Sequence, residues 1–273
     1  MKYSIKLRNG QILRGLIVSP GENARANIVF VHGLGEHIGR YVPWAELFRN
    51  AGIGFTGVDL PGHGSSGGKR GHIRSYDLTD EMIDLLISHT GSAFTGVPVF
   101  LYGHSLGGNI VLDYLLRKTP GIAGAVVTSP WLILRAQPGK SKLVLASAMK
   151  YVLPGLTQAS GLNPEHLSRD RDVVERYLAD PLVHERISVS LFHNAAGAAK
   201  NSLSASSSLK VPLLLMHGSD DQITSPEGSR EFASGNNLTE IKIWDDGYHE
   251  LHNEPFREEV FSFITDWINR MSA

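Results

Sequence analysis

The sequence contains no cysteine among its 273 residues. This absence excludes disulfide bridges, a thiol nucleophile and cysteine metal sites. Charged residues form only 19% of the chain and nearly cancel, with 26 lysines and arginines against 27 aspartates and glutamates. No cluster of lysines and arginines interrupts this balance, so the sequence does not indicate binding to a nucleic acid or to an acidic surface. A small neutral substrate fits this composition better.

Long hydrophobic runs are also missing. No apolar stretch reaches the roughly 20 residues that a membrane span needs. The N-terminal segment 1–8 alternates polar with apolar residues, whereas a signal peptide has a continuous apolar run. We therefore expect a cytoplasmic protein, with any membrane contact being peripheral. The hydrophobic content of 42% is sufficient for one large globular domain.

Short apolar runs that end in Gly-rich or acidic loops recur along the chain. Because most of them do not alternate with polar residues, we expect strands buried on both faces of a parallel sheet. The predicted strands are 3–7, 12–18, 28–31, 55–58, 97–102, 125–128, 211–216 and 241–244, and the predicted helices are 43–51, 79–90, 106–118, 226–234 and 255–270. Asn9-Gly10 joins the first two strands as an antiparallel hairpin. The pattern predicts an α/β fold with a mostly parallel eight-stranded sheet flanked by helices.

The segment 130–209 interrupts this alternation with helical patterns and no clear strand. We interpret it as an inserted helical cap, or lid, on a core formed by residues 1–129 and 210–273. Its stretch 140–153 carries a broad apolar arc beside lysines, which is expected either to pack on the core or to make peripheral membrane contact. Packing is the commoner outcome. The Ser- and Ala-rich stretch 201–208 fits a linker or a weak helix.

Two serines match the pattern G-x-S-x-G, which is a weak signal alone. Ser66 lies in Gly64–Gly68, and no helix-forming run follows it. Ser105 lies between a predicted strand and a predicted helix, the strand-turn-helix context of a nucleophile elbow. Gly103 and Gly107 remove side chains that would collide in so sharp a turn. We therefore predict that Ser105 is the nucleophile, the alternative being a Gly-rich turn without chemistry.

A serine nucleophile needs a histidine base that is oriented by a carboxylate. Of the twelve histidines, His249 follows the last predicted strand and precedes the last helix, the position expected for the base. His252, three residues further on, is the alternative. Asp220 and Asp221 both follow the strand 211–216 and compete for the role of the acid. None of the remaining histidines shows a metal-ligand spacing, and we expect neither a metal nor an organic cofactor.

The oxyanion of an acyl-transfer reaction needs backbone N–H donors that are already in place. Leu106, immediately after the nucleophile, is one candidate. Leu34, in the glycine-rich loop 32–35 after the third strand, is the other. The simpler interpretation of that loop is a turn without a ligand.

Together these motifs resemble the monoacylglycerol lipase and lysophospholipase branch of the α/β-hydrolases. The resemblance rests on six segments spread along the chain: 32–37 followed by Arg40-Tyr41, 59–64, 103–108, 129–130, 217–221 and 248–254. It covers the core well and the cap only loosely. The α/β-hydrolase fold is therefore the expected architecture.

The resemblance implies several site residues. The family spacing H-G-x-x-D selects Asp221 over Asp220 as the orienting acid. By the same analogy, Glu36, Arg40 and His252 lie where the alcohol part of an ester binds and leaves. The alternative for Glu36 and Arg40 is an ion pair at a helix entry without a role in ligand binding.

The expected activity is hydrolysis of carboxylic esters of lipids, either monoacylglycerols or lysophospholipids, through an acyl-enzyme on Ser105. Two other functions stay open on the sequence alone. Related capped hydrolases cleave amino-terminal residues, which requires an acidic pocket for the substrate amine. A catalytically inactive ligand-binding protein is the second, because a fold alone does not establish chemistry.

Overall fold

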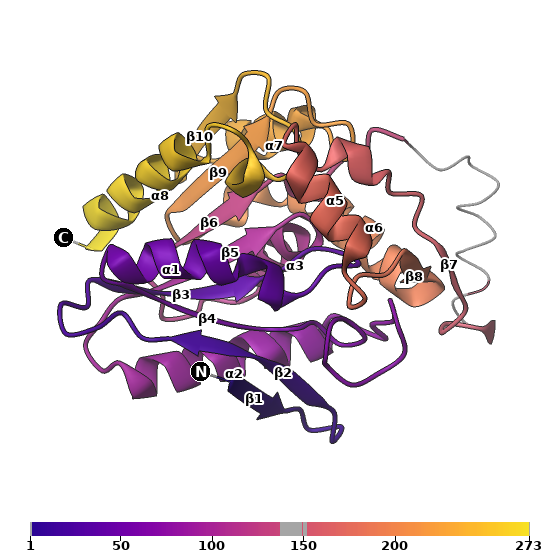
Figure 1. Cartoon of the computed structure of the whole chain (residues 1–273), viewed down its shortest axis with the longest axis horizontal. Coiled ribbons are helices and arrows are strands. Elements are labelled where there is room, and N and C mark those ends of the chain that lie inside the picture. Colours follow the sequence, from indigo (N-terminus) through magenta and orange to yellow (C-terminus); the bar gives the residue numbers. More distant parts are fainter. Residues whose placement is uncertain (1, 137–148, 150–151, 273) are drawn as a thin grey trace.

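The computed structural model describes residues 2–136, 149 and 152–272. Its main sheet has eight strands in the order β1-β2-β4-β3-β5-β6-β9-β10. The strands β3 to β6, β9 and β10 pair in parallel, whereas β2 is antiparallel to both β1 and β4. The prediction of an α/β fold with a mostly parallel eight-stranded sheet is confirmed (Figure 1).

The predicted strands and helices of the core all form, with ends that differ by a few residues. The strands are β1 Lys2–Lys6, β2 Ile12–Val18, β3 Ala26–Val31, β4 Ile53–Val58, β5 Val99–His104, β6 Gly124–Thr128, β9 Leu213–Gly218 and β10 Thr239–Trp244. The helices are α1 Val42–Asn50, α2 Asp77–Ala93, α3 Leu106–Arg117, α7 Pro226–Ser234 and α8 Arg257–Ser272, with short 3-10 helices at Ile38–Tyr41, Ser206–Ser208 and Leu251–Asn253.

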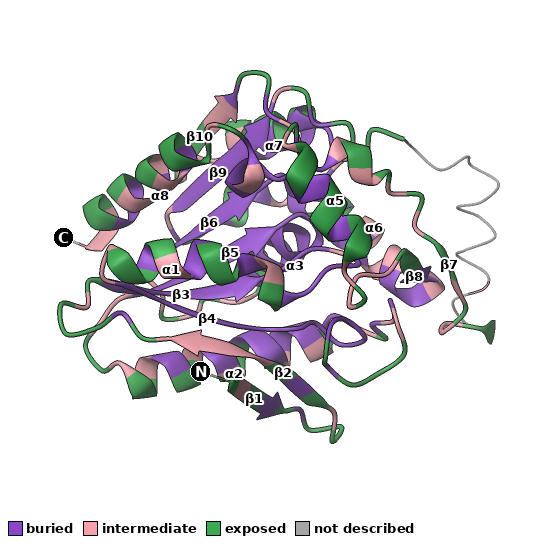
Figure 2. Ribbon diagram, in the orientation of Figure 1, coloured by how far each residue is buried: buried purple, intermediate pink, exposed green. Residues whose placement is uncertain are grey.

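Helices cover both faces of the sheet. Every residue of β3, β4, β5, β6 and β9 is buried (Figure 2). One apolar cluster joins the sheet to α2, α3 and α6, which spans Val189–Ser204. A second cluster joins the sheet to α1 and α8. Burial on two faces explains why these strands read as continuous apolar runs in the sequence.

The described residues of the segment 130–209 lie between β6 and β9 in the chain and interrupt the alternation of strands and helices (Figure 1). It contains β7 Thr157–Ala159, a 3-10 helix Pro164–His166, α5 Arg171–Ala179, β8 Arg186–Ser188 and α6 Val189–Ser204. The expectation of no strand here is wrong, because β7 and β8 pair as an antiparallel ladder. Each has only three residues, too few for an alternation to be recognised. Most of the Ser- and Ala-rich stretch is helical, since α6 extends to Ser204 and a 3-10 helix follows.

The apolar stretch 140–153, for which lipid contact was one expectation, lies largely outside the described residues. No helix in the described ranges is long and apolar enough to cross a membrane.

Candidate active site

Ser105 occupies the sharp turn between β5 and α3. Its backbone has φ 54° and ψ −116°, in a positive-φ region that non-glycine residues seldom adopt. A Cβ on Gly103 would lie 2.6 Å from the carbonyl oxygen of Gly107, and one on Gly107 would lie 2.0 Å from that of Val31. Glycine is therefore needed at both positions for the turn to close. The turn places the serine hydroxyl at the carboxyl end of β5, beside the N-terminus of α3, where negative charge is stabilised.

The structure brings Ser105 together with the other two residues predicted for the triad. His249 Nε2 lies 2.8 Å from Ser105 Oγ, and His249 Nδ1 lies 2.7 Å from Asp221 Oδ2. Asp221 follows β9 and His249 follows β10, so adjacent parallel strands deliver acid and base to one edge of the sheet. Asp221 and His249 are buried, and Ser105 is 9% exposed. This is the geometry of a serine activated by a base that a carboxylate orients.

Asp221 and Asp220 have opposite environments. Asp221 Oδ1 accepts the backbone N–H groups of Ile223 and Thr224 at 2.7 and 3.0 Å, while Oδ2 faces His249. Burial raises the pKa of Asp221, but the charge of His249 and hydrogen bonds from neighbouring histidines lower it further than burial raises it. Asp220 is exposed, and its carboxylate accepts a hydrogen bond from Ser219 at 3.2 Å. Only Asp221 is positioned to orient the base.

The pKa of His249 is raised above its ordinary value. Burial lowers it, but the charge and hydrogen bond of Asp221 raise it more, and Glu250 and Glu36 add to the effect. A base must be neutral to accept the serine proton, so a raised pKa moves the loss of activity on the acid side to higher pH.

We therefore expect the kcat/KM for a neutral ester to fall on the acid side with a midpoint above about pH 6.5, the ordinary value for histidine. The profile is measured from pH 5 to 9, with folding checked at each pH by circular dichroism. Asp220→Asn serves as the control and should leave the midpoint unchanged. A midpoint well below pH 6.5 in the folded protein would contradict the assignment of His249 as the base.

The loop after β3 lies beside Ser105. The N–H of Gly33 is engaged, because it donates to Glu36 Oε1 at 2.6 Å. Leu34, the predicted oxyanion donor, is the next residue and lines the same hollow as Ser105. The carbonyl of Gly35 accepts the N–H of His184 from the cap at 2.8 Å. Leu106, the second predicted donor, is the first residue of α3.

A small hollow opens over Ser105. It is lined by Gly33, Leu34, Glu36, Arg40, His104, Ser105, Leu162, Leu167, Tyr177, His249 and Glu250. Two of the three residues predicted for the alcohol side, Glu36 and Arg40, are among them, and they also form the ion pair that was the alternative, at 2.7 Å. His252 is not among the described residues that line the hollow. Its ring packs against Tyr41 with centroids 4.8 Å apart.

Of the residues of this hollow that sequence reasoning missed, three are polar or aromatic. Glu250 binds Arg40 through two hydrogen bonds of 2.7 and 2.8 Å. Tyr177 of the cap lies under the Arg40 guanidinium, 4.8 Å from its ring centroid. His104 packs against His249 with ring centroids 4.9 Å apart. The available signal was adjacency, since Glu250 follows the predicted base and His104 precedes the predicted nucleophile.

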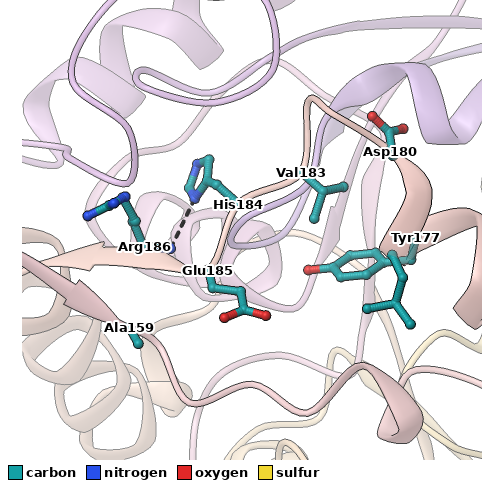
Figure 3. A pocket seen from close by; sticks show the side chains of 8 residues that line it. Ala159, Tyr177, Asp180, Val183, His184, Glu185 and Arg186 are labelled. Atoms are coloured by element: carbon teal, nitrogen blue, oxygen red, sulfur yellow. Dashed lines mark hydrogen bonds between the residues drawn. The ribbon is translucent and has the colours of Figure 1, made fainter.

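A second hollow lies on the cap and shares Tyr177 with the first. Its wall includes Asp180, Val183, His184, Glu185 and Arg186 (Figure 3). It does not include Ser105 or His249. The predicted nucleophile and base therefore line the first hollow, although the second is the larger.

Ser66, the other match to the serine pattern, is part of the scaffold. Its hydroxyl donates to the carbonyl of Asp59 at 2.7 Å and accepts the N–H of Arg14 at 2.9 Å. The bond to Asp59 closes the loop after β4 on itself, and the bond from Arg14 fixes that loop against β2. Neither partner is a base that could activate the hydroxyl.

Comparisons with known proteins agree with this geometry. The family model described as "Serine aminopeptidase, S33" matches residues 22–256. The chain is 33% identical over 240 residues to phospholipase YtpA of Bacillus subtilis, covering 86% of this chain and 92% of that protein. It is 31% identical over 255 residues to the monoacylglycerol lipase of Mycolicibacterium smegmatis, covering 92% and 90%. An uncharacterized abhydrolase domain-containing protein of Dictyostelium discoideum is 36% identical over 247 residues, 89% of this chain but only 26% of that longer protein.

A solved structure is similar along its whole length. The monoacylglycerol lipase of Paleococcus ferrophilus superposes with a TM-score of 0.86 at 36% identity, covering 94% of this chain and 98% of that one. The fold is therefore that of the α/β-hydrolase lipases and esterases.

Proposed function

The chain belongs to the serine aminopeptidase S33 family of α/β-hydrolases and is a carboxylic ester hydrolase, and we propose that it cleaves lipid esters of glycerol through Ser105. The observation that carries the proposal is the line of hydrogen bonds from Ser105 through His249 to Asp221. Ser105 and His249 also line a hollow with apolar and polar residues. Monoacylglycerols are the first substrate class, and lysophospholipids are the second.

The reaction begins with proton transfer from Ser105 Oγ to His249 Nε2, 2.8 Å away. The oxygen attacks the ester carbonyl, and the N–H groups of Leu34 and Leu106 stabilise the resulting oxyanion. Asp221 holds the imidazolium in place through Nδ1. The bond to the alcohol then breaks, the departing oxygen takes the proton from His249, and the acyl group stays on Ser105.

Water completes the cycle. His249 takes a proton from a water molecule, whose oxygen attacks the acyl carbon. A second oxyanion forms at the same donors, the bond to Ser105 breaks, and its oxygen regains the proton. The fatty acid is released. No step uses a metal or an organic cofactor.

The walls of the hollow suit an ester with unlike halves. Leu162 and Leu167, both from the segment 130–209, supply apolar surface, and Glu36 and Arg40 supply polar groups. Apolar walls with a few fixed polar groups orient an amphipathic ligand. The acyl chain would lie along the two leucines, and the glycerol would lie against Glu36 and Arg40.

An aminopeptidase needs an acidic group free to hold the substrate amine. The hollow contains two glutamates, but Glu36 and Glu250 both bind Arg40. An amine would share these carboxylates with the guanidinium of Arg40, and the two positive charges would repel each other. The geometry therefore favours esters over N-terminal amides.

The test is a hydrolysis panel that contains two esters and one N-terminal amide. We expect turnover of 1-octanoylglycerol and of p-nitrophenyl octanoate, with alanine p-nitroanilide cleaved at least about a hundredfold less efficiently. Fatty acid release is followed by pH titration and nitroaniline release by absorbance. Faster cleavage of the anilide than of either ester would overturn the proposal.

A further inference from the structure

Arg40 is held between two buried carboxylates. Its Nη1 lies 2.7 Å from Glu36 Oε2 and 2.7 Å from Glu250 Oε1, and its Nη2 lies 2.8 Å from Glu250 Oε2. The side chains of Glu36, Glu250 and Arg40 are only 4%, 2% and 11% exposed. These three residues, here called the acidic clamp, connect the loop after β3 to the loop that carries His249.

Both glutamates accept hydrogen bonds from groups other than Arg40 as well. Glu36 Oε1 accepts the N–H of Gly33 and the hydroxyl of Tyr41, at 2.6 and 2.9 Å. Glu250 Oε2 also accepts the side-chain amide of Asn253 at 2.7 Å. Burial raises the pKa of Glu250, but the charge and hydrogen bonds of Arg40 lower it well below its ordinary value. Two carboxylates and one guanidinium leave the clamp with one net negative charge.

Among the described residues that line the hollow, Arg40 is the only lysine or arginine. His104 is also buried, which lowers its pKa and keeps it neutral. The remaining described lining residues are the reacting pair Ser105 and His249, together with leucines, a glycine and Tyr177. Beyond Tyr177, the second hollow again has two carboxylates, on Asp180 and Glu185, against one arginine (Figure 3).

We propose that Glu250 is a positioning residue which occupies Arg40 and sets one net negative charge on the alcohol side of the hollow, so that uncharged glycerol esters are accepted and phosphate-bearing glycerol esters are excluded. The inference rests on the proposed lipid esterase function and selects between its two substrate classes. It assigns the choice between these substrate classes to Glu250, which does not itself react.

The physical reason is the direction of the hydrogen bonds. Carboxylates only accept, so they can bind the hydroxyl groups of a glycerol. A phosphate also only accepts, and it would need the guanidinium, which is the bidentate donor suited to it. Glu250 uses both terminal nitrogens of Arg40. The phosphate would therefore face a carboxylate instead of a donor, and like charges placed together in an interface oppose binding.

The experiment compares two esters with the same acyl chain, 1-octanoylglycerol and 1-octanoylglycerol 3-phosphate, both below their aggregation concentrations. For the unmodified protein we expect kcat/KM to favour the neutral ester by about a hundredfold or more. Glu250→Gln keeps the shape but removes the charge, so it should narrow this ratio by about tenfold or more. The double variant Arg40→Gln/Glu250→Gln lacks the guanidinium, so its preference for the neutral ester should return toward that of the unmodified protein.

Glu254→Gln is the matched control. Glu254 is fully buried in the same segment and binds Arg169 Nε at 2.7 Å, but it does not line the hollow. It should leave the substrate ratio within about twofold of the unmodified value. Thermal unfolding of all variants separates a folding defect from a change in selectivity.

The outcomes distinguish the two proposals. Equal efficiency on both esters in the unmodified protein would overturn the role of the clamp while leaving lipid ester hydrolysis intact. The same holds if folded Glu250→Gln slows both esters by one factor. Absence of turnover on both esters by a folded protein that cleaves p-nitrophenyl acetate would overturn the proposed function and this inference together.

Discussion

Replacing Ser105 by alanine is expected to lower kcat for p-nitrophenyl octanoate by about 10⁵-fold or more. The substitution removes the oxygen that forms the acyl-enzyme and leaves only the contribution of binding and oxyanion donors. Ser105 is 9% exposed, and its hydroxyl is the side-chain partner of His249 Nε2. The thermal unfolding midpoint should therefore change little. Burst kinetics and steady-state turnover measure the effect.

The matched control is Ser66→Ala, which alters the other serine in the same short pattern. Ser66 forms two scaffold hydrogen bonds, and losing them should lower the free energy of unfolding by about 1–3 kcal/mol. Its turnover should stay within a few-fold of the unmodified protein. A reversal, with folded Ser66→Ala inactive and Ser105→Ala active, would contradict the assignment of the nucleophile.

Asp221→Asn is the second variant with a large expected effect, a loss of about 10⁴-fold in kcat. The amide cannot favour the required tautomer of His249 or balance the charge that the imidazolium carries in the transition state. If the amide oxygen accepts the N–H groups of Ile223 and Thr224, as Asp221 Oδ1 does, the NH₂ group would face the donating hydroxyl of Thr224 and His249 Nδ1 at the position of Oδ2. We therefore expect a measurable loss of stability as well, followed by thermal unfolding.

Asp220→Asn provides the comparison at the adjacent position. Asp220 is exposed, and we expect its replacement to change kcat by less than about threefold. The pH dependence of both variants adds an independent measure, because loss of the Asp221 charge should lower the pKa of His249. If Asp220→Asn lost far more turnover than Asp221→Asn, the acid would be misassigned.

The strongest sequence signals were those in which a local pattern and a chain position agree. Ser105 stands between a continuous apolar run and a helical pattern, and the structure gives it the strained backbone of a tight turn. Ser66 matches the same letters, but its neighbours predict no helix, and it folds into a loop. The core strands could be predicted because burial on both faces leaves a composition that is visible in the sequence.

The features that were missed depend on contacts across long sequence separations. Glu250 meets Arg40 over 210 positions, so no spacing rule indicates the pair. The ladder of β7 and β8 joins residues 157–159 to 186–188 through strands of three residues. The resemblance places His252 on the alcohol side, and this stays a prediction; its ring contacts Tyr41, and it is not among the described residues that line the hollow. Such placements follow from tertiary packing and not from local pattern.

The central claim is that Ser105 carries the acyl group during ester hydrolysis. Its most direct test is labelling of the native protein with a fluorophosphonate, followed by peptide mass mapping, in the presence and absence of 1-octanoylglycerol. The account predicts stoichiometric modification of Ser105, slowed by the glycerol ester and absent in Ser105→Ala. Modification of another residue with parallel loss of activity, or full turnover by protein that stays unlabelled, would contradict it.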